Sequence, residues 1–273
     1  MYPELLKIGP ITIYSFGLMM GIAFLVASML LSAEVKRRGK DATIGTSITM
    51  ISLIGGIAGA KLFHLFENWS DFIGDPIGMA FSSGGLTWYG GFLLATALIY
   101  VFIRRKKITF FEMADMAAPS LAIGYGIARI GCHLAGDGDY GIATDLPWKT
   151  AYVHGTVPTA FVLDPATGAR VPTEWVHPAP IYEFILGVII FSILYARRKK
   201  NLPVGNQFAW FLLLHPFARL MVEFIRINPR LFLGLSEAQL ISIALLAWGV
   251  FLLVKKSTAS GSKKKLPVGD ARK

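Results

Sequence analysis

The chain repeatedly carries apolar segments about 20 residues long, the length that a helix needs to cross the hydrocarbon core of a bilayer. The sequence predicts spanning helices at residues 11–33, 44–66, 86–103, 110–135, 178–196, 206–226 and 237–254. Only 16% of the residues are charged, whereas soluble domains carry about 25%. We therefore expect an all-α polytopic membrane protein with about seven transmembrane helices and a small extracytoplasmic head domain.

Basic residues form short clusters after alternate segments. They lie at residues 36–40, 104–107, 197–200 and 255–256, and three further lysines lie at 263–265. Seven spans place all of these clusters on one side, which the positive-inside rule makes cytoplasmic. We therefore expect the N-terminus outside and the C-terminus in the cytoplasm. The net charge of +10 then belongs to membrane-flanking loops rather than to a surface that binds nucleic acid.

The predicted organisation has four parts. Residues 1–136 contain the first four transmembrane helices, and residues 177–256 contain the last three. Residues 137–176 are polar and contain several glycines and prolines, which predicts a small extracytoplasmic head of turns and short strands. Residues 257–273 form a basic cytoplasmic tail that we expect to be disordered. The short segment 71–83 is expected to be a surface or re-entrant piece.

The N-terminal segment and the single cysteine carry two smaller expectations. The N-terminus has no basic region before a short apolar core, so no cleavable signal peptide is expected. Cys132 is the only cysteine, which excludes an internal disulfide.

Ionisable residues inside spanning segments cost a few kcal/mol each and usually face a cavity or a partner. In the sixth segment, steps of four, four and three place four of them on one stripe of a helix: His215, Arg219, Glu223 and Arg226. The simpler alternative is that Arg219 and Glu223 only pair with each other. Four ionisable residues on one stripe favour a functional site.

The depth of these residues points to the outer leaflet. A helix rises about 1.5 Å per residue, so Arg129 lies roughly 33 Å from Lys107 on the inner side. By the same rule Glu183 lies about 9 Å from the outer end of the fifth segment. A channel or carrier should also have polar groups at mid-depth, and the first, third and seventh segments have none there.

Two glycine-rich segments lie at the same predicted level. In residues 84–91, the backbone N–H groups of Gly90 and Gly91 at a helix start suit an anion, and close helix packing is an equally good alternative. Residues 129–141 combine a cation, carboxylates and glycines. Their alternative explanation is a helix C-cap followed by a turn.

Phospholipid chemistry fits these groups. Arginine binds phosphate with a planar fork and stays charged, so Arg129, Arg219 and Arg226 would hold an anionic headgroup. Neighbouring carboxylates could orient the arginines or move protons. The sequence shows no cluster of residues at metal-ligand spacing, so neither a metal nor another cofactor is expected.

Six segments resemble, in order and spacing, the prolipoprotein diacylglyceryl transferases of bacterial inner membranes. They are residues 8–19, 84–91, 110–119, 129–141, 177–183 and 217–226. The resemblance implies a seven-helix inner-membrane protein with a periplasmic head. It also implies transfer of the diacylglyceryl group of phosphatidylglycerol to the lipobox cysteine thiol of secreted prolipoprotein precursors.

The same resemblance assigns candidate roles to individual residues. Arg129 and Arg219 would bind and neutralise the phosphate, and Glu223 would hold Arg219. Asp137 or Asp139 stands where the family has a glutamate, and Gly141 matches the glycine that closes that motif. Further candidate phospholipid contacts are Arg226, Gly90, Gly91, Tyr14 and Glu183.

The sequence departs from the family pattern at three positions. Tyr89 stands where the family has its signature histidine, and Cys132 stands where it has an asparagine. Phe16 stands where the family has a tyrosine, and this chain has a tyrosine, Tyr14, two residues earlier. The general base is therefore not assigned. His133 and Tyr89 are candidate catalytic residues, and His133 could equally be a packing residue at a helix end. The departures indicate a divergent branch, in which acceptor and lipid can differ.

Two rival functions use the same features. A non-catalytic phospholipid-binding or lipid-transporting protein needs the same arginines and no histidine base. A small-solute transporter is disfavoured by the lack of polar groups at mid-depth. Formation of a lipidated product separates the transferase from the first rival, and a flux assay tests the second.

Overall fold

The computed structural model of the chain describes residues 1–9, 11–82, 85–159, 161–163, 170–172 and 175–262. The chain divides into two compact units. One unit joins Met1–Ala23 to Ala118–Lys273, and the other is Phe24–Ala117. Two helices, α1 (Ser15–Arg37) and α6 (Phe110–Ala135), contribute residues to both units.

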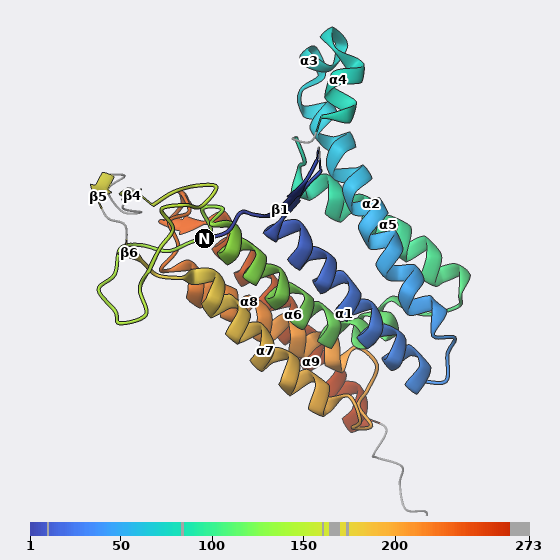
Figure 1. The fold of residues 1–273 in the computed structure, drawn as a ribbon. Helices are drawn as coiled ribbons and strands as arrows, with labels where there is room; N and C mark the ends of the chain where they lie inside the picture. The colour runs from blue at the N-terminus through green and yellow to red at the C-terminus, as the bar shows by residue number, and fades with distance from the viewer. Residues whose placement is uncertain (10, 83–84, 160, 164–169, 173–174, 263–273) are drawn as a thin grey trace, which may run out of the picture. The chain divides into compact units, whose positions relative to one another are not determined.

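In the unit Phe24–Ala117, helices α2 (Thr43–Glu67) and α5 (Trp88–Arg105) pack along each other, as Figure 1 shows. Two short helices, α3 (Trp69–Gly74) and α4 (Pro76–Phe81), follow α2. Glycines allow the two long helices to approach closely. A Cβ atom on Gly59 would lie 2.6 Å from the Cβ of Leu94 and would also meet the carbonyl oxygen of Gly90.

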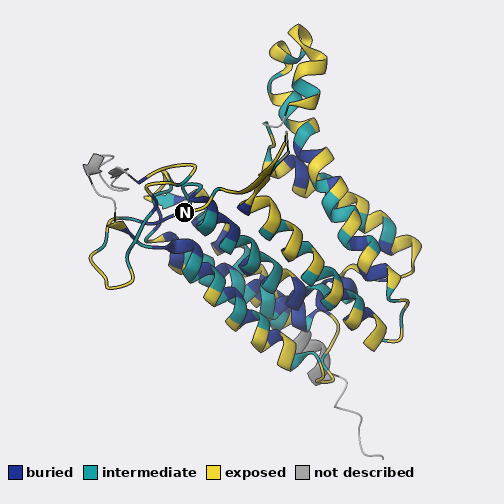
Figure 2. Ribbon diagram, viewed as in Figure 1, coloured by how far each residue is buried: buried dark blue, intermediate teal, exposed yellow. Residues whose placement is uncertain are grey.

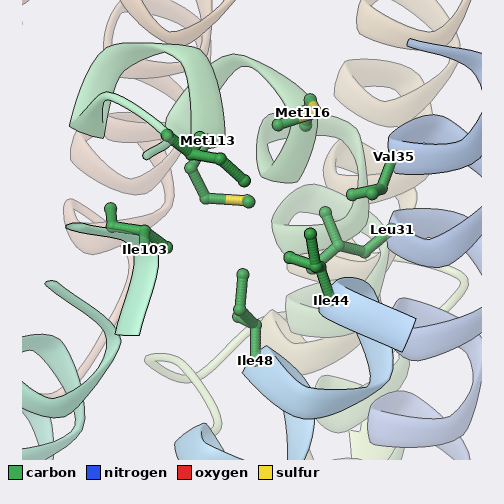
Figure 3. Close-up of a cluster of buried hydrophobic side chains, with 8 residues drawn as sticks. Leu31, Val35, Ile44, Ile48, Ile103, Met113 and Met116 are labelled. Carbon is green, nitrogen blue, oxygen red and sulfur yellow. The ribbon is translucent and has the colours of Figure 1, made fainter. Parts of the chain in front are cut away.

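This unit contains a cluster of buried apolar side chains (Figure 3). Its members come from α1, α2, α5, α6 and the turn before α6: Leu31, Val35, Ile44, Ile48, Ile103, Ile108, Met113 and Met116. Beside it, the buried carboxylate of Glu34 accepts hydrogen bonds from Arg37 at 2.6 Å and Arg38 at 3.0 Å. This pairing compensates the charge of a side chain that is only 3% exposed.

The other unit contains the second part of α6 with α7 (Ala179–Arg197), α8 (Asn206–Glu223) and α9 (Glu237–Ser262) (Figure 1). Gly126 on α6 lies against Gly187 on α7, because a Cβ atom on Gly187 would be 3.1 Å from the Cα of Gly126. Ala118 and Ala122 pack with Ile190 and Leu194 on the same face. This close approach allows Tyr125 on α6 to contact Glu183 on α7.

Short antiparallel strand pairs complete this unit. Residues 137–176 contain β3 (Thr150–Ala151) paired with β6 (Trp175–Val176), and β4 (Phe161–Leu163) paired with β5 (Arg170–Pro172). Two hairpins lie elsewhere in the chain, β1 (Glu4–Ile8) with β2 (Ile11–Tyr14) and β7 (Arg230–Phe232) with β8 (Leu235–Ser236). The strands within 137–176 agree with the expected mixture of turns and short strands.

All seven predicted helices are present, with three corrections to their limits. Residues 11–14 form strand β2, so the first helix begins at Ser15. Helix α8 ends at Glu223, so Arg226 lies in the turn after the helix and not on it. Helix α9 continues to Ser262, beyond the predicted start of the tail, whereas residues 263–273 lie outside the described residues.

Among the residues that the structure describes, four helices are long and apolar enough to cross a membrane. They are α1, α2, α7 and the part of α9 up to Lys255. Figure 2 shows exposed residues along these helices, and on α7 they include the apolar stripe Ile185, Ile189 and Ile193. An apolar stripe that no other part of its unit covers suits contact with lipid. The fold is that of a mainly helical, multi-pass membrane protein.

The contact between α2 and α5 predicts the effect of one added methyl group. Gly59→Ala places a Cβ against Gly90 and Leu94, and such overpacking destabilises a protein by about 1–3 kcal/mol. We expect a lower midpoint of thermal unfolding in detergent. Gly56→Ala on the same helix is the matched control, because no atom lies within 4 Å of its Cβ position. Equal midpoints for the two variants would contradict this account of the contact.

Candidate functional site

Glu183 on α7 is the centre of a cluster of charged side chains. Its side chain is 2% exposed and forms ion pairs with Arg219 at 2.5 Å, Arg129 at 3.1 Å and Arg226 at 3.3 Å. The hydroxyl of Tyr125 also donates a hydrogen bond to Glu183 Oε1 at 2.7 Å. Three guanidinium groups from α6, α8 and the turn after α8 therefore converge on one buried carboxylate.

Glu223, at the end of α8, holds Arg219 from the other side. Its fully buried carboxylate lies 2.7 Å from Arg219 Nη2. Its Oε1 atom accepts hydrogen bonds from Asn228 Nδ2 at 2.6 Å and from Ser236 Oγ at 2.7 Å. The expected pairing of Glu223 with Arg219 is present, and the segment after α8 reinforces it.

Asp139 is the third carboxylate of the cluster and the most exposed one. Its two oxygens form separate ion pairs with Arg129 and Arg226, and 29% of its side chain is exposed. It lies on the loop after α6, where Gly136 at φ +60° and Gly138 at φ +91° adopt the left-handed conformation that favours glycine. Of the two aspartates left open by the sequence, Asp139 rather than Asp137 pairs with the arginines.

The two loop aspartates have opposite electrostatic surroundings. Burial alone would raise the pKa of Asp139, but the positive charges of Arg226 and Arg129 hold that pKa below its ordinary value. Burial, together with the negative charge of Asp139, raises the pKa of Asp137. Asp139 is therefore the ionised partner of the arginines at neutral pH.

Gly141 connects this loop to the neighbouring segments. Its N–H donates to the carbonyl oxygen of His177 at 2.9 Å, and it forms a β-bridge with Arg226. A Cβ atom at this position would lie 2.5 Å from the carbonyl oxygen of Ile225. Only glycine fits there, so Gly141 holds the backbone of Arg226 close to the loop that carries Asp139.

Tyr125 was not predicted from the sequence and belongs to this site. Besides its bond to Glu183, its ring lies 4.8 Å from the guanidinium carbon of Arg129. Tyr125 and Arg129 are four residues apart on α6, and this helical spacing before a candidate arginine is the signal that the sequence offers. With Glu183, Arg219 and His215, Tyr125 lines a cavity of about 10 Å³, about the size of one water molecule.

Three other residues of the same unit that the sequence singled out form none of the ion pairs of this cluster. His133 shares a hydrogen bond of 2.9 Å with the hydroxyl of Tyr152 in the segment 137–176. Cys132 is buried, and its Sγ atom lies 3.5 Å from Arg129 Nη1. Tyr14 ends strand β2 and is 54% exposed.

Tyr89, Gly90 and Gly91 belong to the other unit, at the start of α5. Gly90 and Gly91 are buried against α2. Close packing of the two helices therefore explains why these positions have no side chains. Tyr89 is 42% exposed, and its ring packs edge-on against Trp88. Gly84, the first residue of the predicted motif, lies outside the described residues.

Three potential metal ligands come together, although no such cluster was expected from their spacing. One ligand atom each from Cys132, Asp137 and Asp139 lies within 4.8 Å of the others. Asp139 is already paired with two arginines, and Arg129 also contacts the thiol. The oxygens of Asp139 are therefore engaged by arginines, whose positive charges make this group of described residues poorly suited to a divalent cation.

Comparison with known proteins places this cluster in a family. The model of the family described as prolipoprotein diacylglyceryl transferase matches residues 3–255. Relatives named phosphatidylglycerol–prolipoprotein diacylglyceryl transferase include a Leptospira interrogans protein, 30% identical over 90% of this chain and 89% of its own length. The Synechococcus elongatus protein is 29% identical over 97% and 90%, and the Clostridium tetani protein is 29% identical over 92% and 96%.

The match covers every residue of the arginine cluster, all of one unit and most of the other, and the relatives align over most of their own length. The chain belongs to the prolipoprotein diacylglyceryl transferase family.

Proposed function

We propose that this chain transfers the diacylglyceryl group of phosphatidylglycerol to the lipobox cysteine thiol of prolipoproteins, the first step of bacterial lipoprotein maturation. The observation that carries the proposal is the convergence of Arg129, Arg219 and Arg226 on Glu183 in a member of this family. Convergent guanidinium groups in a water-poor site suit the phosphodiester of an anionic lipid. The names of the relatives supply both substrates.

The proposed setting is the bacterial inner membrane, crossed seven times with the N-terminus outside. Within the part of the chain that the structure describes, four helices meet the requirements of length and apolarity, and α5, α6 and α8 would complete the set. The basic clusters support this orientation. The arginine cluster would then lie at the level of the outer-leaflet headgroups, open to lipid and to secreted precursors.

In the proposed reaction, phosphatidylglycerol enters sideways from the outer leaflet and its phosphate meets the cluster of Arg129, Arg219 and Arg226. The deprotonated cysteine thiol of the precursor attacks the glyceryl carbon next to the phosphate. The new S–C bond forms a thioether, the C–O bond breaks, and glycerol phosphate leaves with the electron pair. The arginines stabilise the charge that grows on the leaving phosphate.

The remaining candidate residues have supporting roles in this proposal. Glu223 and Glu183 position the arginines that they contact. Gly141 places Arg226 by its backbone contacts. Further candidate contacts to the phospholipid, or to the reacting groups, within the unit that holds the cluster are Tyr14, Asp137 and His133.

The direct test mixes purified protein with phosphatidylglycerol and a peptide that contains a lipobox cysteine. We expect the peptide to gain the mass of a diacylglyceryl group and glycerol phosphate to appear in equal amount. A matched peptide with serine in place of cysteine should gain nothing, because its hydroxyl is a much weaker nucleophile. Lipid binding without any mass gain would support the non-catalytic alternative.

Arg129→Lys is expected to lower kcat/KM for transfer by at least about 100-fold, since lysine keeps the charge but loses the planar fork. Arg129 uses separate nitrogens to contact Glu183 and Asp139, which an ammonium group cannot reproduce. The exposed Arg104→Lys on α5 is the matched control and should remain at the wild-type rate. Equal activity of the two variants would reject the role of Arg129.

Glu183→Gln removes the central negative charge and leaves three arginines facing two carboxylates. Removing one partner of a buried ion pair destabilises a protein by about 3–5 kcal/mol, so we expect a clear fall in the midpoint of thermal unfolding together with loss of transfer. Glu4→Gln on exposed strand β1 serves as the control. A midpoint unchanged by Glu183→Gln would show that Glu183 does not organise the cluster.

A further inference from the structure

The charges of the cluster are balanced before any substrate binds. Three arginines, Arg129, Arg219 and Arg226, face three carboxylates, those of Glu183, Glu223 and Asp139. A phosphodiester brings one more negative charge into a site where water is scarce. Uncompensated charge is expensive there, so a carboxylate has to leave when the phosphate arrives.

Asp139 is the carboxylate best placed to leave. The side chains of Glu183 and Glu223 are 2% and 0% exposed and extend from helices. Asp139 is 29% exposed and lies on a loop next to Gly138, and a glycine restricts the backbone less than any residue with a side chain does. Its loss from the cluster therefore requires no rearrangement of a helix.

Asp139 also resembles the ligand in the way that it binds. Each of its two oxygens contacts a different guanidinium group, those of Arg129 and Arg226. The two unesterified oxygens of a phosphodiester offer the same arrangement, one negative charge shared over two acceptors.

Resting on the proposed function, we propose that Asp139 occupies the place of the substrate phosphate in the resting site and exchanges with it on Arg129 and Arg226. The carboxylate keeps the two arginines aligned while no lipid is bound. Phosphatidylglycerol then competes with it, so the apparent affinity for lipid is lowered by the fraction of time that Asp139 occupies the arginines.

The exchange also supplies a proton acceptor for the thiol. The groups that face Asp139 are Arg129 and Cys132 from α6, Asp137 from its own loop and Arg226 from the turn after α8. Once displaced, the carboxylate has lost both cations and remains close to Asp137. It takes the proton of the precursor thiol as the S–C bond forms and the C–O bond breaks. That proton then passes to the departing glycerol phosphate, and Asp139 returns to the arginines.

Asp139→Asn tests both steps, because the amide keeps the size of the side chain and removes its charge. With phosphatidylglycerol diluted in neutral detergent micelles, we expect KM for the lipid to fall about tenfold. We expect kcat to fall about 100-fold in the same variant. Asp145→Asn, which removes an exposed carboxylate in the segment 137–176, is the matched control and should leave both constants unchanged.

A binding measurement without peptide separates this proposal from the proposed function. The rise in unfolding midpoint with added phosphatidylglycerol should occur at a lower lipid fraction in Asp139→Asn than in the wild type. An unchanged or higher lipid requirement would overturn the exchange, and a wild-type kcat would overturn the proton step. If the wild type bound lipid but formed no product, only the proposed function would fail.

A second substitution keeps the test valid if Asp139→Asn does not fold. Asp139→Glu retains the competing charge, so its KM for the lipid should not fall. A tenfold lower KM in Asp139→Glu would contradict the exchange, because a carboxylate would still be present to compete.

Discussion

The ion pairs around Glu183 are the interaction on which the site depends. One carboxylate that is 2% exposed contacts three guanidinium groups and a tyrosine hydroxyl. In surroundings of low dielectric each charge needs its partners, because an unpaired buried charge costs several kcal/mol. The arginines therefore cannot be removed or rotated independently, and their arrangement exists before lipid arrives. Such preorganisation is what allows a site to stabilise charge on a leaving phosphate.

Glycines at a few close contacts allow the segments that carry the charged side chains to approach one another. The approach of Gly126 to Gly187 brings α6 and α7 together beside Tyr125 and Glu183. Gly141 keeps the turn that carries Arg226 against the loop after α6. These positions have no side chain because the backbones or side chains of neighbouring segments occupy that space. The charged side chains can therefore meet because Gly126, Gly141 and Gly187 have no side chains that would hold the segments apart.

The sequence was sufficient to predict where the seven long helices lie, because a long apolar segment is a local signal. It also drew attention to Arg129, Arg219 and Arg226, because charged residues are rare in such segments, and the structure brings these three side chains together. Arg219 with Glu223 followed from helical spacing. The sequence could not decide which of Asp137 and Asp139 pairs with the arginines. That choice depends on the geometry of the loop, which is set by the left-handed glycines and by Arg226, 87 residues away from Asp139 in the chain. Tyr125 was missed because a tyrosine in an apolar helix carries little information without its partner.

Two expectations changed for physical reasons. Gly90 and Gly91 were equally compatible with an anion site and with helix packing, and their burial against α2 supplies the packing explanation. The stripe of four ionisable residues was correct for His215, Arg219 and Glu223, but the helix ends before Arg226. The turn there places Arg226 between Glu183 and Asp139, which a continued helix would not ensure.

The most direct test of the central claim is an experimental structure of the chain in a bilayer that contains phosphatidylglycerol. We expect the lipid phosphate to lie in the arginine cluster, on the guanidinium groups of Arg129 and Arg226 that Asp139 contacts in the resting site, in the leaflet opposite the basic loops. A phosphate bound elsewhere, with these arginines still closed around protein carboxylates and no lipid path leading to them, would contradict the account.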